Sequence, residues 1–338
     1  MASLNDTSNL FSKLNWSRTF NAGSVLLSYY WSRLIKKPRP LGLPIAMAIE
    51  PTTSCNLRCP QCPSGLRSFS RPTGMLHEDE FRKIIDETQR HLLYLTFYFQ
   101  GEPYLNPKFL DMVRYASSKN IYTTTSTNAH FLKDDVARKT VESGLDRIII
   151  SIDGTTQESY QAYRIGGQLE KVIEGTERLI YWKKKLRSRT PHVIFQFIVF
   201  RQNEHEISEI RKLAKRIGVN ELKLKTAQVY DFANSDDLLP SDHKYARYEE
   251  AAGIMRIRNK FLNHCWRLWH ACVITWDGSV VPCCFDKDAK HSMGNLRDKS
   301  LKDIWYGPAY DAFRRSLFKS RKEIDICSNC SEGTKVWA

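Results

Sequence analysis

Three features that mark common protein classes are missing from this sequence. It contains no run of about 18 apolar residues, so we expect no segment that spans a membrane. Residues 1–21 are polar and lack an apolar stretch before a small-residue cleavage site, so we expect no secretory signal. The sequence shows no internal repeat and no low-complexity segment. These absences favour a cytoplasmic globular protein, and 338 residues suffice for one large barrel with an appendage.

Acidic residues are scarce relative to basic ones. The chain has 37 Asp and Glu against 51 Lys and Arg, which gives a formal net charge of +14. Such an excess favours an anionic partner: nucleic acid, an acidic lipid surface, or a phosphorylated or carboxylated substrate. A charge that only keeps the protein soluble explains the excess equally well. Nucleic acid is an unfavoured partner, because no aromatic-rich RNA platform is evident.

Residues 1–42 form a basic arm that differs from the rest of the chain. The arm carries six basic residues and a single acidic one, Asp6. Its segment 24–40 predicts a short amphipathic helix that Pro38 and Pro40 end, with an apolar side formed by Val25, Leu26, Tyr29, Tyr30 and Ile35. Two interpretations stay open. The helix docks on its own domain, or it contacts anionic lipid at the inner face of the membrane through Arg33, Lys36, Lys37 and Arg39.

Short apolar strands alternate with amphipathic helices from residue 45 to residue 229. We expect strands near residues 45–52, 92–99, 121–127, 146–153, 192–200 and 221–229, with helices between them. This alternation predicts parallel β/α units, and six units make a partial (β/α)6 TIM-like barrel, since a full barrel needs eight. The barrel domain is expected over residues 43–230.

A linker and a helix (roughly 245–262) are expected over residues 231–262. Residues 263–338 then predict a small cysteine-rich domain that consists of a β-hairpin, turning at Asp277 and Gly278, and a helix. The fold class is therefore α/β, with a small C-terminal appendage.

Three of the nine cysteines, Cys55, Cys59 and Cys62, lie close together in the stretch CNLRCPQC. The stretch follows the first strand, and in a β/α barrel that end carries the active site. Zinc sites usually pair two CxxC knuckles or a CxxC with histidines, but the nearest histidine here is His77. Three thiolates suit three irons of a 4Fe–4S cube, which leaves the fourth iron open to a small molecule. Zinc and three unrelated cysteines are the alternatives.

This CxxxCxxC loop resembles that of radical S-adenosylmethionine (SAM) enzymes. The resemblance implies that the amino and carboxylate groups of SAM chelate the open iron. Gln61 stands where the family often has an aromatic residue near the adenine. Further stretches resemble the SAM-binding motifs of this family: YFQGEPYLNP, TSTNAHFL and ISIDGTTQESYQAYR. They imply that SAM is bound by Gly101, Glu102, Asn128, Ser151 and Arg164.

The C-terminal cysteines resemble those of a SPASM or twitch auxiliary-cluster domain. By that resemblance, the hairpin and the CSNC knuckle supply four thiolates to a second, fully ligated 4Fe–4S cluster, through Cys265, Cys283, Cys327 and Cys330. Cys284 is an alternative to Cys283, although its side chain should point to the opposite face of the strand. Cys272 lies on a hairpin strand and is interpreted as a small core residue. Zinc at this site is the alternative.

The resemblance implies an oxidoreductase that cleaves SAM reductively to a 5′-deoxyadenosyl radical and takes hydrogen from an unactivated C–H bond. An electron donor such as flavodoxin or ferredoxin would reduce the first cluster, and the auxiliary cluster would accept an electron from the substrate radical. The expected substrate is small, sugar-like, lipid-linked or otherwise anionic. A peptide-modifying enzyme and a basic zinc-binding scaffold without catalysis are the rival interpretations. No catalytic base is assigned, although Tyr230 and Asp231 follow the sixth strand on the expected face.

Overall fold

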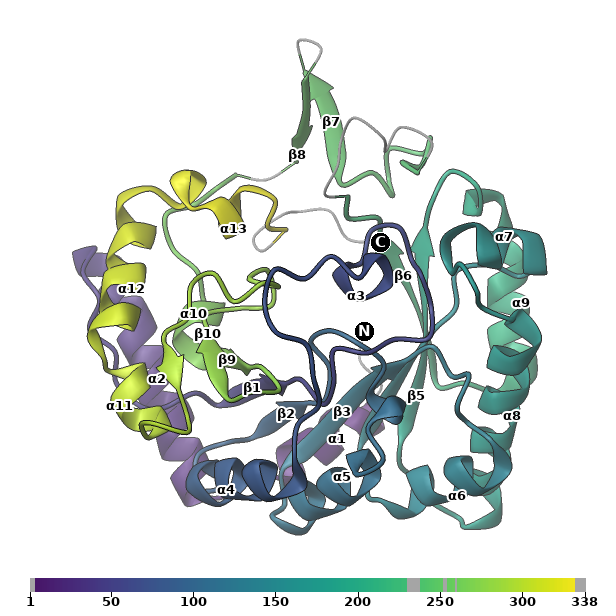
Figure 1. The fold of residues 1–338 in the computed structure, drawn as a ribbon, viewed down its shortest axis with the longest axis horizontal. Helices are drawn as coiled ribbons and strands as arrows, with labels where there is room; N and C mark the ends of the chain where they lie inside the picture. Colours follow the sequence, from purple (N-terminus) through teal and green to yellow (C-terminus); the bar gives the residue numbers. More distant parts are fainter. Residues whose placement is uncertain (1–3, 230–237, 252–253, 259, 332–338) are drawn as a thin grey trace.

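The computed structural model describes residues 4–229, 238–251, 254–258 and 260–331 (Figure 1). Six parallel strands neighbour one another in chain order, which confirms the predicted partial barrel. They are β1 (Ala46–Ile49), β2 (Tyr94–Thr96), β3 (Tyr122–Thr127), β4 (Arg147–Ser151), β5 (His192–Val199) and β6 (Glu221–Thr226). The helices that connect them form an outer layer around the sheet. The candidate site therefore lies at the carboxyl ends of these strands.

The connecting helices are α4 (Glu78–Thr88), α5 (Phe109–Ser118), α6 (Asp134–Glu142), α8 (Leu169–Lys185) and α9 (Ile207–Ile217). Each buries an apolar stripe against the sheet; in α4 the stripe includes Phe81, Ile84 and Ile85. Short elements also occur in the loops: α3 (Pro63–Leu66), α7 (Gln157–Tyr163) and two 3-10 turns, η1 (Pro103–Leu105) and η2 (Glu204–Glu206). The sequence analysis did not anticipate α3 or α7.

The C-terminal segment continues the barrel sheet beyond its first strand. Strand β9 (Ala271–Ile274) pairs in parallel with β1, and β10 (Ser279–Val281) and β11 (Gly294–Asn295) follow antiparallel. The predicted hairpin at Asp277 and Gly278 is present between β9 and β10. The other C-terminal elements are α10 (Arg267–His270), α11 (Leu301–Trp305), α12 (Pro308–Ser320), η3 (Arg321–Glu323) and α13 (Asp325–Ser328). Pairing with β1 places the cysteine-rich segment beside the CxxxCxxC loop.

The expected helix over residues 245–262 is wrong. The segment contains an antiparallel pair, β7 (Tyr248–Ala251) and β8 (Ile254–Ile257). Tyr248 and Ile257 are buried in a small cluster with Val229 and Leu239. Helix propensity is a weak prior, and packing against this cluster decides the conformation. Tyr230 and Asp231, considered above as candidate bases, lie outside the described residues.

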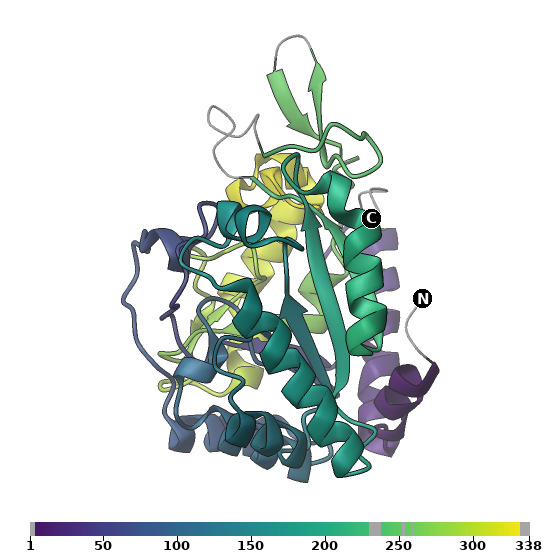
Figure 2. The same ribbon diagram turned by 90° about the vertical axis from the view of Figure 1, so that its right-hand side faces the viewer.

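The N-terminal arm forms two helices, α1 (Leu4–Ser12) and α2 (Trp16–Ile35), along one side of the barrel (Figure 2). Helix α1 covers the amino ends of β3 and β4, where the buried Asp6 pairs with Arg147 and accepts a hydrogen bond from Tyr122. Arg18 is buried and donates to the carbonyl oxygens of Gln89 and Lys119, each at 2.9 Å. The arm therefore closes the end of the barrel opposite the candidate site.

Helix α2 is longer than expected, and it docks on its own domain. Tyr29 packs edge-on against Trp266 and Trp269, and its hydroxyl hydrogen-bonds His264 Nδ1 at 2.8 Å. Of the expected apolar side, Val25 and Tyr29 are buried, whereas Leu26 and Tyr30 are exposed. No helix in the described part of the chain is long and apolar enough to cross a bilayer.

Candidate active site

The loop that carries Cys55, Cys59 and Cys62 leaves the carboxyl end of β1 and ends in α3. It is tightly wound: the Cys62 N–H donates to the Cys59 carbonyl oxygen, and the Leu57 N–H donates to Cys55 Sγ at 3.4 Å. Gly65 lies so close to this loop that a Cβ atom there would be 2.5 Å from the Cys59 nitrogen. All three cysteines line one cavity of about 290 Å³. The sequence therefore holds three thiols around a common space.

The five predicted SAM-binding residues line the same cavity, although they come from three different loops. They are Gly101, Glu102, Asn128, Ser151 and Arg164. Each follows or ends one of the strands β2, β3 and β4, so the parallel sheet brings them together at one edge. Their binding role stays a prediction, since the structure shows only their convergence beside the three thiols.

Gly101 has a structural requirement of its own. Its φ is +74°, and a Cβ atom there would lie 2.2 Å from the carbonyl oxygen of Thr52. Glycine is therefore needed for the contact between the loops after β1 and β2, whether or not a ligand is bound. Its N–H donates to Ser64 Oγ at 2.9 Å. This contact fixes the following residue, Glu102, at the floor of the cavity.

Glu102 is buried and held by neighbouring donors. It accepts hydrogen bonds from Thr127 Oγ1 at 2.7 Å and from the Asn128 N–H at 2.8 Å. Burial raises the pKa of Glu102 to about 7, and these hydrogen bonds only partly oppose the shift. An amino group in the cavity would donate N–H hydrogen bonds to this buried carboxylate and offset part of the cost of ionising it. Glu102 is therefore an acceptor that fits the amino group of SAM.

Arg164 approaches the cysteines from α7. Its Nε donates to Asp153 Oδ2 at 2.6 Å, and its Nη1 lies 3.9 Å from Cys59 Sγ. Asp153 is fully buried and also accepts from the Ile198 N–H at 2.7 Å. The sequence analysis missed Asp153. The carboxylate in the stretch SIDG, immediately after a strand, was the available signal.

The thiols themselves fit an iron–sulfur cluster. Burial raises the pKa of Cys55 to about 12, so this thiol does not ionise at neutral pH without a cationic partner, and burial also raises the pKa of Cys59 although Arg164 opposes the shift. Cluster irons would supply that partner. Among the described residues, no three Cys, His, Asp or Glu side chains are grouped as ligands of a single metal ion. Each thiolate of a 4Fe–4S cluster binds its own iron, so its ligands need not meet at one point.

A second cysteine cavity lies in the C-terminal segment. Its lining includes all four predicted auxiliary ligands, Cys265, Cys283, Cys327 and Cys330. The rest of the lining is mainly apolar, apart from Arg267 and Arg321. Arg321 Nη2 donates to Cys330 Sγ at 3.2 Å, and burial raises the pKa of Cys327 to about 12. Four thiols and a cation in a closed apolar cavity fit a fully ligated cluster.

Two neighbouring cysteines, Cys283 and Cys284, line different cysteine cavities. Cys283 lines the second cavity, whereas Cys284 lines the first one, together with Cys55, Cys59 and Cys62; both also line a further cavity of about 340 Å³. They lie in a turn after β10, so the alternation expected for a strand does not apply to them, and the choice of Cys283 as the ligand stays a prediction. Cys272 is buried in the main core, as its interpretation as a small core residue requires.

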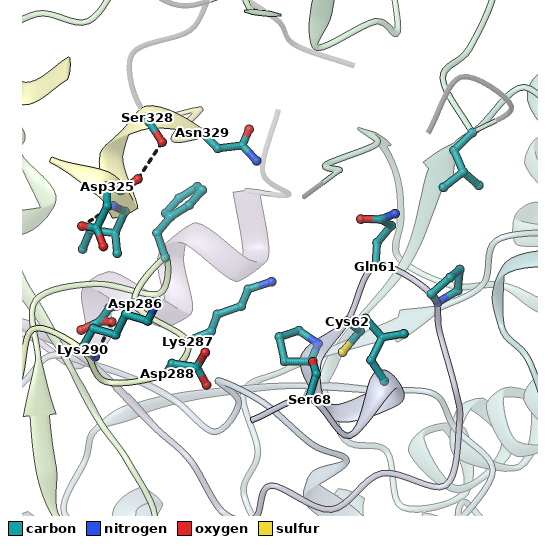
Figure 3. Close-up of a pocket in the computed structure, with 16 residues that line it drawn as sticks. Gln61, Cys62, Ser68, Asp286, Lys287, Asp288, Lys290, Asp325, Ser328 and Asn329 are labelled. Atoms are coloured by element: carbon teal, nitrogen blue, oxygen red, sulfur yellow. Dashed lines mark hydrogen bonds between the residues drawn. The ribbon is translucent and has the colours of Figure 1, made fainter. Parts of the chain in front are cut away.

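A third cavity, of about 740 Å³, lies between the CxxxCxxC loop and the C-terminal segment (Figure 3). One wall consists of residues 60–63, and the other includes Phe285, Lys287 and Asn329. Figure 3 shows the Lys287 side chain reaching across the cavity toward Gln61 and Cys62. Lys287 also lines the first cavity, so it lies where the two spaces meet. No sequence pattern marked Lys287 for this position.

Comparison with known proteins agrees with both cysteine sites. Residues 49–214 match the model of the radical SAM superfamily, and residues 265–331 match SPASM, an iron–sulfur cluster-binding domain. The chain belongs to the radical SAM superfamily and carries a C-terminal SPASM domain. The radical SAM domain indicates an enzyme and implies a 4Fe–4S cluster and SAM.

One curated relative and two solved structures illustrate these matches. The relative is the tungsten-containing aldehyde ferredoxin oxidoreductase cofactor-modifying protein of Pyrococcus furiosus. It is 28% identical over an alignment of 315 residues that covers 84% of this chain and 86% of the relative. SuiB of Streptococcus suis bound to S-adenosylmethionine has a TM-score of 0.64 and 15% identity, over 90% of this chain and 76% of SuiB. BtrN in complex with AdoMet and 2-DOIA has a TM-score of 0.52 and 17% identity, over 86% of this chain and 94% of BtrN. At these identities the two structures support the fold alone.

Proposed function

We propose that this radical SAM enzyme oxidises a small anionic substrate at an unactivated C–H bond. Cys55, Cys59 and Cys62 would hold the first 4Fe–4S cluster, and the residues around Glu102 and Arg164 would hold SAM. When bound and reduced by one electron, this pair would supply a 5′-deoxyadenosyl radical that takes a hydrogen atom from the substrate. Cys265, Cys283, Cys327 and Cys330 would hold an auxiliary cluster able to accept the electron that the substrate gives up as it also loses a proton, so that the net change would be a two-electron oxidation.

The large cavity is the observation that carries this proposal. It is lined on one side by Cys62 and on the other by residues 285–288, which begin two positions after the ligand candidate Cys283. A substrate in this cavity would contact Cys62 of the first site, and also Phe285 and Ile326, which line the second cysteine cavity as well. The arrangement supports hydrogen abstraction at one wall and electron transfer through the other, because the four thiols of the second cavity would ligate every iron of a cluster bound there.

An anionic substrate is favoured by the lysines of the cavity. Lys287 and Lys290 line it, and so do three aspartates. The aspartates are engaged by the protein: Asp286 accepts from two backbone N–H groups, Asp325 pairs with His291, and Asp288 accepts from the Ser70 N–H. The lysine at the junction of both cavities, Lys287, is thus the cation best placed to bind a phosphate or carboxylate. Sugar-like and lipid-linked substrates both carry such groups.

Peptide modification is the second candidate. SuiB, whose fold this chain shares, has also been solved bound to a precursor peptide, SuiA. The P. furiosus relative is described as cofactor-modifying, which favours a small molecule. We expect a flavodoxin or ferredoxin as the electron donor, in the cytoplasm. Contact with the inner face of the membrane is a separate proposal, argued below.

The test is anaerobic reconstitution with iron and sulfide, followed by dithionite and SAM. Formation of 5′-deoxyadenosine with about eight irons per chain is expected for two 4Fe–4S clusters. About four irons with activity would refute the auxiliary cluster, and zinc without SAM cleavage would refute the enzyme. Substrates are then screened by their stimulation of 5′-deoxyadenosine formation. Lys287→Ala should abolish stimulation by phosphate or carboxylate compounds and preserve basal cleavage; unchanged stimulation would exclude the anionic subsite.

A further inference from the structure

Helix α2 has two apolar faces on opposite sides. One face is buried against the barrel and includes Val25 and Tyr29. The other, which we call the outer face, is formed by Trp16, Phe20, Leu27, Trp31 and Leu34. At 100° per residue these five side chains fall within an arc of about 60° on the helix. Their exposed fractions are 92%, 80%, 71%, 57% and 74% in the same order. The outer face is therefore a continuous apolar stripe turned away from the protein.

The basic arm is where the described surface is most apolar. Ten of the sixteen exposed large apolar side chains lie between Leu4 and Leu41. Single exposed apolar residues are normal on a protein surface, but a gathered stripe marks a contact site. Two of the five outer-face residues are tryptophans, the side chains that favour the boundary between water and lipid.

The charges around the outer face have one sign. The sequence has no acidic residue between Asp6 and Glu50. Arg33, Lys36, Lys37 and Arg39 are exposed at the end of α2 and just beyond it. Their backbone is fixed, because Lys36 caps the helix with φ +53° and the Arg39 N–H donates to Ser32 Oγ at 2.9 Å. Arg33 falls on the side of α2 that carries Tyr29, and Lys36, Lys37 and Arg39 follow the last turn, so four cations gather at this end of α2 with no acidic residue in this stretch of the sequence.

We propose that the outer face of α2 binds an anionic lipid bilayer. The helix would lie in the plane of the membrane, with its apolar stripe among the acyl chains and its basic end on the lipid phosphates. A second copy of this chain is a poorer partner, because a symmetric contact would bring two sets of four cations together without acidic partners. The proposal concerns attachment, since no described helix is apolar enough to span a membrane.

The test is flotation of the full-length reconstituted protein with vesicles of phosphatidylcholine alone or with 30% phosphatidylglycerol. We expect binding to the anionic vesicles, at least tenfold weaker binding to the neutral ones, and loss of binding at high salt. The Leu27→Ser/Trp31→Ser variant should weaken binding to anionic vesicles at least tenfold. The matched control, Tyr181→Ser/Leu186→Ser, removes two exposed apolar residues of the barrel and should bind like the wild type.

Tryptophan fluorescence gives a second measurement that needs no destabilising change. Brominated anionic lipids should quench wild-type emission, and Trp16→Phe/Trp31→Phe should remove most of that quenching. Folding is checked by circular dichroism and by SAM cleavage, which the outer-face variants should retain. Absence of vesicle binding by the wild type would overturn the proposal. So would a wild-type dimer that Leu27→Ser/Trp31→Ser converts to a monomer, because that result would assign the outer face to a second copy.

Discussion

The two cysteine sites use the same ligand atom in opposite surroundings. The site of Cys55, Cys59 and Cys62 lines a cavity shared with Glu102 and Arg164, and Cys62 also reaches the large cavity. The site of Cys265, Cys283, Cys327 and Cys330 lies in a small, mainly apolar cavity, where Cys327 and Cys330 are buried. One cavity thus has the three thiols of the loop, the thiol of Cys284 and room for a ligand, while the other has four thiols and much less space.

This difference indicates that the residues around a group of cysteines, more than the cysteines themselves, determine what chemistry the site can perform. A site with an open position and polar neighbours can bind and activate a small molecule, whereas a closed site can only exchange electrons. Each site also has an arginine beside a thiol. Arg164 pairs with Asp153 and lies 3.9 Å from Cys59 Sγ at the first site, whereas Arg321 donates to Cys330 Sγ at 3.2 Å in the second.

The largest effect is expected from loss of the open site. Cys59→Ala removes one of three ligands, and no fourth thiol from this loop can replace it, so 5′-deoxyadenosine formation should fall below detection. Iron should drop from about eight to about four per chain, because the auxiliary cluster has its own four ligands. Anaerobic reconstitution, iron analysis and chromatography of the SAM products measure this. Retained cleavage would remove Cys59 from the ligand set.

The neighbouring pair Cys283 and Cys284 provides a matched comparison of the two sites. Cys283→Ala should lose the auxiliary cluster and about four irons while 5′-deoxyadenosine still forms, because the first site is intact. Cys284→Ala should keep all iron, because its side chain faces the first cavity. Iron content and the electron paramagnetic resonance spectrum of the reduced clusters measure both. If the two variants exchanged phenotypes, Cys284 would be the ligand.

Much of this comparison could be predicted from the sequence. The alternating strand and helix patterns predicted the barrel, because each β/α unit buries its own apolar stripe and this stripe is visible in the local sequence. The spacing of the cysteines predicted the two sets of thiols, because the spacing of ligands within one loop or knuckle is also a local feature. The pair β7 and β8 was missed, because Tyr248 and Ile257 pack on residues that the local pattern does not include.

Contacts between distant segments were the other part that the sequence could not show. The pairing of β9 with β1 joins residues more than 220 positions apart, and with the hydrogen bonds from Ser70 and Arg71 to residues 287 and 288 it brings Lys287 and Cys284 to the first cavity. The ion pair of Asp153 and Arg164 depends on how α7 folds back over β4. Such juxtapositions follow from topology, so a sequence motif marks the ligands but leaves their neighbours unidentified.

The buried pair beside the open site gives the next prediction. Asp153→Asn leaves the Arg164 guanidinium buried without its counter-charge, which should cost about 3 kcal/mol of unfolding free energy. SAM binding should weaken at least tenfold, because Arg164 is no longer held in place. Asp135→Asn is the control, since its pair with Lys139 is exposed and should change stability by less than about 0.5 kcal/mol. Chemical denaturation and SAM titration measure both; equal behaviour of the two variants would refute the positioning role.

The smallest effect is a pH dependence of SAM binding at Glu102. Burial raises its pKa to about 7, above its usual value, so the carboxyl is mainly protonated below pH 7 and ionised above it. The ionised form is the stronger acceptor for the N–H groups of the SAM amino group, which would bind the open iron through its nitrogen. The ionised fraction falls about tenfold between pH 8 and pH 6, so SAM affinity should fall in parallel as the pH is lowered. The Glu102→Gln variant cannot ionise at this position, whereas every other titrating group is kept. Its affinity for SAM should therefore be lower than that of the wild type at pH 8, and it should lack the part of the fall between pH 8 and pH 6 that Glu102 causes. A wild-type affinity that follows the Gln variant at every pH would show that Glu102 does not contact the amino group of SAM.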